Sequence, residues 1–284
     1  MVPALGKVGI WSMELRFGDK TQGAAAAAEL EALGYGAIWV PGGIGGDVTG
    51  DLDHLLDATS KITIATGIIN IWKHEPSEIA DWFKALPVDR QDRVLLGIGV
   101  SHGPLIGEAW AKPLAVTRDY IDKLEAAGLP ADHICLAALG PKMTELSGNR
   151  TAGSHPYLTT PEHTRQARAI LGPEALLAPE QGVILETDPD KARELALGAL
   201  THYRRLPNYV NSWKRLGFSD AEIEAPSDRL LHALFAMGTP DDAKARVEEH
   251  VAAGASHVCA QVITGGMDTG KALESWRALA AALL

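Results

Sequence analysis

Hydrophobic residues in this chain gather in short runs that alternate with longer amphipathic stretches. Each run is apolar along its whole length, which is typical of strands in a parallel sheet that is covered on both faces. The stretches between the runs have the spacing of helices, and glycine or proline marks many of their ends. The predicted strands span residues 8–11, 37–40, 62–69, 93–99, 133–138, 152–155, 182–186 and 257–263.

Eight strand–helix units of about 35 residues each predict an α/β fold, a (β/α)8 TIM-type barrel in place of an open sheet. The segment between the last two predicted strands is too long for one helix, so we expect a helical insertion over roughly residues 188–256. We see no linker or low-complexity tract in the pattern. Residues 1–284 are therefore expected to form a single barrel domain.

Composition narrows the classes of partner. The formal net charge of −10 argues against a nucleic-acid or membrane surface as the partner and favours a small molecule. Cys135 and Cys259 each lie in an apolar run and are expected to be buried free thiols in a reducing, cytoplasmic compartment. Residues 1–7 lack a signal-peptide pattern, and no apolar run has the length of a membrane span.

In a barrel, functional side chains come from the carboxyl ends of the strands and the loops after them. The predicted ends here are rich in small residues and low in charge. They carry neither the paired carboxylates of a glycosidase nor the histidine spacing of a metal site, so no metal is expected. A large, flat ligand with polar edges fits them better. The ends comprise residues 12–14, 41–43, 70–74, 99–102, 138–142 and 155–160.

Gly67 interrupts the third predicted strand, although the apolar run continues on both sides of it. An interior glycine marks a bulge, a bend or the close approach of a ligand. Asn70, Trp72, Lys73 and His74 follow directly. We interpret this stretch as the wall of a pocket; an ordinary bulged strand and loop is the alternative.

Two helix starts are candidate anion sites. Gly140 precedes Pro141 at the first position of a predicted helix, where free amides and the helix dipole attract a phosphate, and Lys142 lies nearby. Thr159 and Thr160 precede a second predicted helix in the same way. Each stretch is also a common helix start without a ligand, and both meanings stay open.

Residues 99–103 match the Gly-x-Ser-x-Gly pattern of a serine hydrolase, with Ser101 as the nucleophile. That pattern requires a helix directly after the serine. Pro104, Gly107 and Pro113 follow instead, so we expect the match to be coincidental.

Glu14 and His102 are the candidates for proton transfer at the predicted mouth of the barrel. A carboxylate or an imidazole there can exchange a proton near neutral pH. His74 and His155 are alternatives of the same kind. Each of these side chains equally suits an ordinary loop.

Four motifs occur along the chain in an order that is known from one enzyme superfamily. They are Arg-Val-Leu-Leu-Gly-Ile-Gly at 93–99, the interrupted strand at 66–70, Ala-Leu-Gly-Pro-Lys-Met at 138–143 and Gly-Ser-His-Pro-Tyr at 153–157. In this order they resemble the bacterial luciferase-like monooxygenase superfamily, and more closely its actinobacterial branch of deazaflavin (F420)-dependent oxidoreductases. The resemblance covers nearly the whole chain.

The resemblance implies a TIM-like barrel with a late insertion and a bulge in the third strand. At the bulge it implies a non-proline cis peptide, Gly67–Ile68, behind the central ring of the cofactor. It places Asn70 against the ring or its ribityl arm, and Gly99 and Val100 along the edge of the ring.

For the cofactor's phosphate arm, the resemblance implies a path along Ala138, Leu139, Gly140 and Pro141. It implies that Thr159 then meets the phosphate. These are the same two helix starts that the residues themselves suggest.

We therefore expect an oxidoreductase that transfers a hydride between C5 of F420 and a small organic substrate. Sugar-phosphate dehydrogenases of this superfamily carry an Asp-His pair where this chain has Pro41 and Gly42, so that substrate is not expected. An FMN-dependent monooxygenase on the same fold is the alternative. A serine hydrolase using Ser101 is the second, and a cofactor-binding protein without turnover is a further one. Members of the superfamily are often dimers, so the resemblance also suggests a homodimer.

Overall fold

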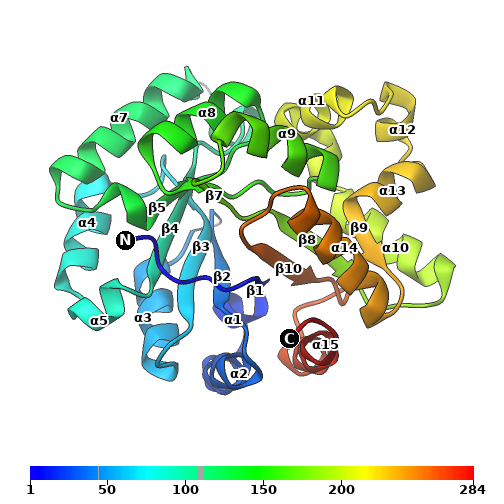
Figure 1. The fold of residues 1–284 in the computed structure, drawn as a ribbon, viewed down its shortest axis with the longest axis horizontal. Coiled ribbons are helices and arrows are strands. Elements are labelled where there is room, and N and C mark those ends of the chain that lie inside the picture. The colour runs from blue at the N-terminus through cyan, green and yellow to red at the C-terminus, as the bar shows by residue number, and fades with distance from the viewer. Residues whose placement is uncertain (44, 108–109, 111) are drawn as a thin grey trace.

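A computed structural model describes residues 1–43, 45–107, 110 and 112–284 of the chain. In this part, ten parallel strands form one sheet in the order β7-β6-β5-β4-β3-β2-β1-β10-β8-β9, with helices around it (Figure 1). The strands are β1 (Val8–Trp11), β2 (Ala37–Gly42), β3 (Thr63–Asn70), β4 (Val94–Gly99), β5 (Ile134–Leu136), β6 (Gly153–Ser154), β7 (Leu176–Leu177), β8 (Glu180–Ile184), β9 (Phe235–Met237) and β10 (Val258–Val262).

Proline opens α4, α7–α11 and α14, because its fixed φ and missing N–H suit the first helical position. Gly34, with φ of 99°, ends α2 in the left-handed conformation that glycine favours. The structure describes no helix with the length and apolar character that crossing a membrane requires. The helices are α1 (Glu14–Phe17), α2 (Lys20–Leu33), α3 (Val48–Ala58), α4 (Pro76–Ala85), α5 (Val88–Gln91), α6 (Gly103–Ile106), α7 (Pro113–Ala126), α8 (Pro141–Arg150), α9 (Pro161–Leu171), α10 (Pro189–Leu200), α11 (Pro207–Arg215), α12 (Asp220–Glu224), α13 (Asp228–Leu234), α14 (Pro240–Ala252) and α15 (Thr269–Leu283), with 3-10 turns η2 (Ala131–His133) and η3 (Tyr203–Arg205).

The sheet closes on itself through one extended segment. Only Ala178 and Pro179 separate β7 from β8 along the chain. β7 pairs with β6, whereas β8 pairs with β10. Between them, the Ala178 amide donates to the Ser154 carbonyl and the Cys259 amide donates to the Pro179 carbonyl, both at 2.9 Å. The two ends of the strand order therefore meet, and the predicted α/β barrel is confirmed.

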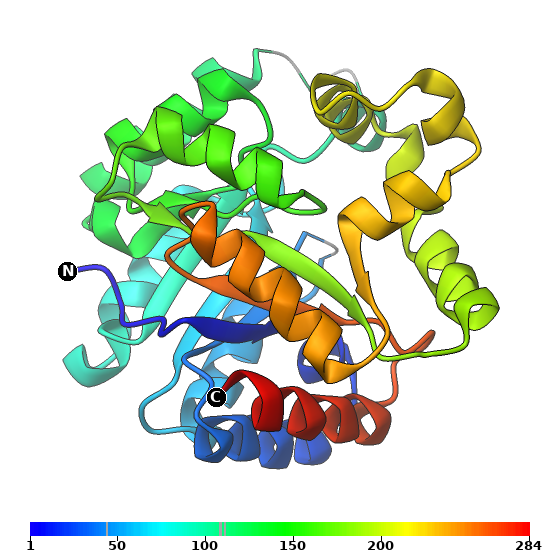
Figure 2. The same ribbon diagram turned by 45° about the vertical axis from the view of Figure 1, so that its right-hand side comes forward.

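The insertion between β8 and β10 lies where the sequence predicts it, but it is not wholly helical. Helices α10–α13 gather on one side of the barrel (Figures 1 and 2), and β9 and α14 follow them. β9 pairs in parallel with β8, in the register Gly182↔Phe235 to Ile184↔Met237. The expectation of helices alone was wrong because β9 has only three residues and begins where α13 ends, so no strand period could separate it.

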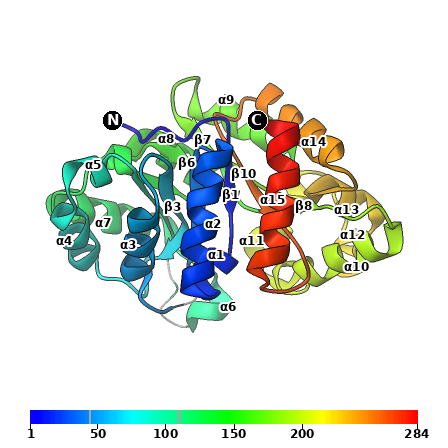
Figure 3. The same ribbon diagram turned by 90° about the horizontal axis from the view of Figure 1, so that it is seen from below.

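Aromatic rings fill the interior of the barrel at its amino-terminal end. Trp39 Nε1 donates to His257 Nε2 (3.1 Å), and His257 Nδ1 donates to the Gly6 carbonyl (3.0 Å). The Trp39 ring also stacks on His155, with centroids 4.3 Å apart, and His155 Nδ1 donates to the Ala178 carbonyl (2.7 Å). In Figure 3 the two chain ends lie at one end of the barrel, near the tops of the paired helices α2 and α15, and α1 and α6 lie at the other. Because these rings fill the amino-terminal end, a ligand can enter the barrel only at its carboxyl-terminal end, which we call the mouth.

Candidate functional site

The floor of the mouth is a bulge in β3. Pairing with β4 slips by one residue between Thr66 and Ile69, so Gly67 and Ile68 together face Gly97. The Gly67–Ile68 peptide is cis, as the family resemblance implied. Gly67 and Ile68 keep partial solvent access, whereas the neighbouring residues of β3 are buried. The structure therefore confirms the predicted bulge and leaves its surface open at the mouth.

Two rings occupy the space below Gly67. Trp11 Nε1 donates to the Gly67 carbonyl (3.1 Å). A Cβ added to Gly67 would lie 2.5 Å from Trp11 Nε1 and 2.6 Å from His155 Nε2. Such contacts are closer than any side chain tolerates, so this position must be glycine. The bare backbone of β3 is what the bulge presents to the mouth, and it suits the face of a flat ring.

Gly99 and Val100, predicted to line the ring, end β4 beside the bulge. A Cβ added to Gly99 would lie 3.0 Å from Ile68 Cδ1 and 3.1 Å from Ala137 Cβ, so this glycine makes room for the side chain of the bulge. Val100 is buried, and its carbonyl accepts from Trp72 Nε1 (2.8 Å). Both residues lie at the floor; their contact with a cofactor stays a prediction.

Asn70 ends β3 and is buried. Its Oδ1 accepts from the Trp72 amide (3.1 Å), and its carbonyl accepts from the Lys73 amide (3.0 Å). The loop itself therefore holds the side-chain oxygen, and Nδ2 is the part of Asn70 that a ligand can use. Lys73 is exposed and His74 is half-buried, with its pKa lowered chiefly by burial. These two residues belong to the loop that leads into α4.

The two candidates for proton transfer lie in separate surroundings. Glu14 begins α1, and its buried carboxylate accepts from Ser12 Oγ (2.7 Å). His102 precedes α6, its ring lies 5.3 Å from that of Tyr209, and burial lowers its pKa. No hydrogen bond among the described residues joins Glu14 to His102. The structure does not bring them together, and their roles stay predictions.

Ser101 has a left-handed backbone, with φ of 58°, but little else of a hydrolase nucleophile. β4 is part of a closed barrel, and α6 after it has only four residues. In the described part of the chain, no hydrogen bond links the Ser101 hydroxyl to an imidazole. A serine nucleophile needs such a base within reach. The hydrolase alternative therefore lacks its structural context.

We expect a fluorophosphonate probe to label the protein only at background level, because in the described part of the chain no imidazole bonds to the Ser101 hydroxyl. Labelling of the wild type and of Ser101→Ala should agree, with a ratio of about 1, while a known serine hydrolase in the same gel serves as positive control. Strong labelling that disappears in Ser101→Ala would restore the hydrolase alternative.

A second part of the site lies where α8, α9 and α11 meet. Residues 138–141 form the loop from β5 into α8, as predicted. The Leu139 carbonyl in this loop accepts from Arg215 Nη2 (2.8 Å) and from His163 Nε2 (3.1 Å). A cavity of about 90 Å³ lies beside it, bordered by Pro141 and Ser212 among others. The insertion thus supplies side chains to the predicted phosphate site through α11.

The polar groups around this cavity suit a phosphorylated polyol. Among the described residues, no carboxylate lies within ion-pair distance of Arg215. Ser212 Oγ is buried beside the cavity without a partner, and Thr159 Oγ1, just before α9, is buried in the same state. These are donors of the kind a phosphate requires, and the Lys142 amide in the first turn of α8 adds to them, since the Met143 amide is taken by the Gly140 carbonyl. His163 Nδ1 is a buried acceptor without a partner, because Nε2 carries the proton, and it suits a hydroxyl.

The predictions from sequence missed one group of polar side chains at the mouth: Tyr157, Glu180, Tyr203, Tyr209 and Gln261. Glu180 is fully enclosed in β8, and burial raises its pKa to about 8. The predicted strand begins at residue 182, two residues after Glu180, so no signal in the sequence placed this residue in a buried strand. The tyrosines come from a loop and from the insertion, whose packing the sequence does not disclose.

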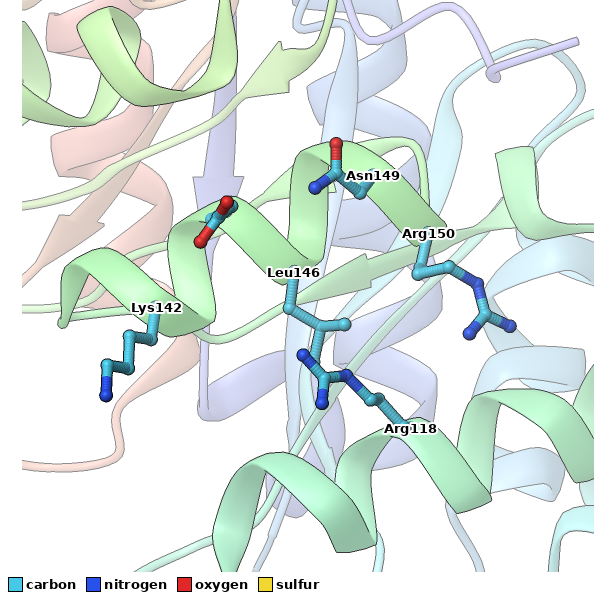
Figure 4. A pocket seen from close by; sticks show the side chains of 6 residues that line it. Arg118, Lys142, Leu146, Asn149 and Arg150 are labelled. Carbon is cyan, nitrogen blue, oxygen red and sulfur yellow. The ribbon is translucent and has the colours of Figure 1, made fainter.

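A larger cavity, of about 260 Å³, lies outside the barrel between α7 and α8 (Figure 4). Arg118, Lys142 and Arg150 bring positive charge to it. Glu145 also borders the cavity, and Arg150 already pairs with Asp122 at 2.6 Å. Because this cavity lies between two outer helices, away from the bulge, we do not place the functional site here.

A comparison with family models identifies the first part of the chain. Residues 14–128 match the model of the luciferase-like monooxygenase family. This stretch runs from the start of α1 past the end of α7 and contains the β3 bulge. The resemblance noted in the sequence is confirmed at this level.

Solved structures with the same fold include enzymes of two cofactor types. An F420-dependent secondary alcohol dehydrogenase, in complex with an F420–acetone adduct, is 15% identical, with a TM-score of 0.72 and 100% of both chains covered. The coenzyme F420-dependent tetrahydromethanopterin reductase from Methanopyrus kandleri is 16% identical, with the same TM-score and coverage. The oxygenating constituent of 3,6-diketocamphane monooxygenase from the CAM plasmid of Pseudomonas putida, in complex with FMN, is 12% identical, with a TM-score of 0.71 and coverage of 99% and 98%. At these identities the likeness establishes the fold alone.

Proposed function

Because residues 14–128 carry a luciferase-like monooxygenase domain and the whole chain adopts the fold of such enzymes, we propose that the protein is an F420-dependent oxidoreductase acting on a small organic substrate. The observation that carries the proposal is a group of polar side chains at the start of α8: Arg215, which forms no ion pair among the described residues, and the unpartnered Ser212 Oγ and His163 Nδ1. Arg215, Ser212 and His163 face a cavity there. A polyol phosphate arm satisfies these groups, and F420 has such an arm.

The residues present fit the cofactor at both of its ends. Arg215, the Ser212 and Thr159 hydroxyls and the Lys142 amide would bind the phosphate, and His163 Nδ1 would accept from a hydroxyl of the arm. The bulge at residues 67–68 would support the ring. When bound, F420 supplies the hydride at its C5 atom. The chain binds the cofactor, orients the substrate over its face and keeps water out of the mouth.

An FMN-dependent monooxygenase, using reduced flavin and dioxygen, is the second candidate function. FMN has a similar tricyclic ring and the same polyol phosphate arm, so the groups at α8 suit it as well. The FMN-bound structural neighbour favours this alternative. Titration of the protein with each cofactor, followed by quenching of tryptophan fluorescence, separates the two. We expect saturable F420 binding at micromolar concentration; tight FMN binding with no response to F420 would overturn the choice.

Arg215→Ala is expected to weaken cofactor binding about tenfold to hundredfold. A charge-assisted hydrogen bond contributes about 1.5–3 kcal/mol, and each 1.4 kcal/mol is a factor of ten in affinity. The dissociation constants of the wild type and the variant, measured by the same fluorescence titration, test this.

Arg205→Ala is the matched control, because Arg205 is an exposed arginine of the same insertion, in η3. It should bind the cofactor like the wild type. Equal affinity of Arg215→Ala and Arg205→Ala would remove the phosphate site from α8. Binding of neither F420 nor FMN by the wild type would overturn the proposed function itself.

A further inference from the structure

The mouth of the barrel holds one group of polar side chains that the cofactor sites do not use. We call it the tyrosine–glutamate cluster: Tyr157, Glu180, Tyr203, Tyr209 and Gln261. We propose that this cluster recognises the substrate, and that it takes an uncharged organic molecule through an oxygen atom to which Glu180 donates a hydrogen bond. The inference rests on the proposed function, because it names the substrate class of the same mouth.

Hydrogen bonds and ring contacts join the cluster across three parts of the fold. The Tyr203 hydroxyl donates to the Tyr157 hydroxyl (3.4 Å), which donates to Gln261 Oε1 (2.8 Å) on β10. The rings of Tyr157 and Tyr203 are 5.4 Å apart, and those of Tyr203 and Tyr209 are 4.9 Å apart. Trp11, which bonds to the bulge, lies 5.8 Å from Tyr157. The cluster is therefore continuous with the floor of the mouth.

Part of this cluster remains open to solvent. Tyr157, Tyr203 and Gln261 keep partial access, as Gly67 and Ile68 do on the floor. A small molecule that enters the mouth can therefore contact these three side chains. The aromatic rings of the cluster suit an apolar body with few polar atoms.

Glu180 carries the buried polar atom of the cluster that has no partner among the described residues. Its side chain is 1% exposed, and Oε2 accepts from the Leu158 amide (2.9 Å). Oε1 is buried and has no hydrogen-bond partner among the described residues. The next residue, Gln181, points the other way and bonds to His250, so the alternation of β8 directs Glu180 into the barrel. Because this atom is unpaired in the protein alone, it can form a hydrogen bond to a ligand without giving one up.

The protonation of Glu180 decides what it can bind. Burial raises the pKa of this carboxyl to about 8, and among the described residues no cation lies within ion-pair distance of it. At neutral pH it is mostly a carboxylic acid, whose O–H donates to a carbonyl or hydroxyl oxygen. A charged Glu180 also raises the pKa of Tyr157, Tyr203 and Tyr209, after burial, which is the larger cause. An anionic substrate would find no counter-charge here.

Three probes with the same ring and different charge test the proposal: acetophenone, benzoate and benzylamine. Saturation-transfer NMR titrations are made on the protein alone and on the protein saturated with whichever of F420 or FMN it binds. We expect saturable binding of acetophenone and at least tenfold weaker binding of both ions. The affinity for acetophenone should fall roughly tenfold between pH 7 and pH 9, because an ionised Glu180 cannot donate.

Substitutions at Glu180 test whether acetophenone binding depends on the hydrogen bond that Glu180 donates or only on the shape of its side chain. Glu180→Gln keeps a donor that does not ionise, so it should bind acetophenone within about threefold of the wild type and without the pH dependence. Glu180→Leu should bind about fivefold to tenfold more weakly. Glu194→Gln, at an exposed glutamate of α10, is the control and should behave like the wild type. If Glu180→Leu does not fold, Tyr157→Phe, which breaks the link to Gln261, should weaken binding about threefold in its place.

The outcomes distinguish this inference from the proposed function. If neither cofactor binds but acetophenone binds with the expected pH dependence, the cluster stands and the proposed function falls. If F420 binds but acetophenone shows no saturable binding in either form of the protein, the proposed function stands and this inference falls. Two further results would overturn this inference. One is binding of benzylamine or benzoate as tight as that of acetophenone. The other is an affinity for acetophenone that depends on pH in Glu180→Gln as it does in the wild type.

Discussion

Gly97→Ala is expected to destabilise the folded protein by more than about 3 kcal/mol, which is a large effect for one methyl group. Gly97 is the single residue of β4 that faces the two-residue bulge. A Cβ at this position would lie 2.1 Å from the Thr66 carbonyl oxygen and 3.2 Å from Ile68 Cγ2. The nearer atom is backbone and cannot rotate away, and Gly97 also pairs with Cys135 of β5 on its other side. Two strands would have to shift to admit the methyl group.

Two other glycines give a graded comparison, measured as free energies of unfolding from urea titrations. Gly99→Ala should cost less than Gly97→Ala, because its neighbours at 3.0–3.2 Å are side-chain atoms that can move. Gly198→Ala should stabilise the protein by about 0.5–1 kcal/mol, since Gly198 lies inside α10 with nothing within 4 Å of the added atom. A Gly97→Ala protein within 1 kcal/mol of the wild type would contradict the close packing of the bulge.

Stability is expected to fall steeply as the pH drops below about 6. Burial lowers the pKa of His155 and His257 to about 4, and burial, with a smaller effect from Arg246, lowers that of His250 to about 3. At pH 5.5 these three histidines are neutral in the folded protein but protonated in the unfolded chain, where their pKa is 6.5. Because the unfolded chain binds more protons, each histidine contributes about 1.4 kcal/mol per pH unit in this range.

Glu180 acts in the opposite direction. Its pKa of about 8 means that, between about pH 4.5 and 8, the folded protein holds a proton that the unfolded chain has released. This stabilisation is complete at low pH and is lost as the pH rises through 8. Below pH 6.5 the three histidines outweigh it, with a net slope of about 2.7 kcal/mol per pH unit; above pH 6.5 stability should fall by about 1.4 kcal/mol per unit. We expect maximum stability near pH 6.5.

Urea unfolding in half-unit steps from pH 5 to pH 9 tests both limbs of this profile. In Glu180→Gln the descending limb above pH 6.5 should become flat, while the histidine limb remains. Glu194→Gln should keep both limbs, because its carboxylate is exposed on α10. A wild-type profile that stays flat from pH 6.5 to pH 8.5 would mean that Glu180 is ionised in the folded protein.

Much of the fold follows from the sequence, for local reasons. A strand buried on both faces must be apolar along its length, so β1–β5, β8 and β10 stand out as runs. Proline at the first position of α4 or α8 also acts within one turn of the chain. β7 and β9 were not predicted: each has two or three residues, and β9 directly follows the apolar residues of α13, so neither stands out as a separate run.

In the candidate site, too, the residues with a local sequence signature were predicted and those brought in by tertiary contacts were not. Gly67 was recognised because a bulge changes the residue type at its own position, and residues 138–141 were recognised because a helix start has a local signature. Arg215 was missed, since it reaches Leu139 from 76 residues away. Glu180 was missed because it precedes the predicted strand at 182–186, whereas the observed β8 begins at Glu180 itself.

The sequence by itself determined the order of strands and helices, the place of the bulge and the starts of α8 and α9. These features depend on the conformational preferences of a few adjacent residues. Only the tertiary structure decided that α11 brings Arg215 to the start of α8, and that Tyr157, Glu180 and Gln261 meet at the mouth. Closing the sheet brings residues from distant strands together at the mouth. The burial that shifts their pKa values, and leaves their polar atoms for a ligand, exists only once the barrel has closed.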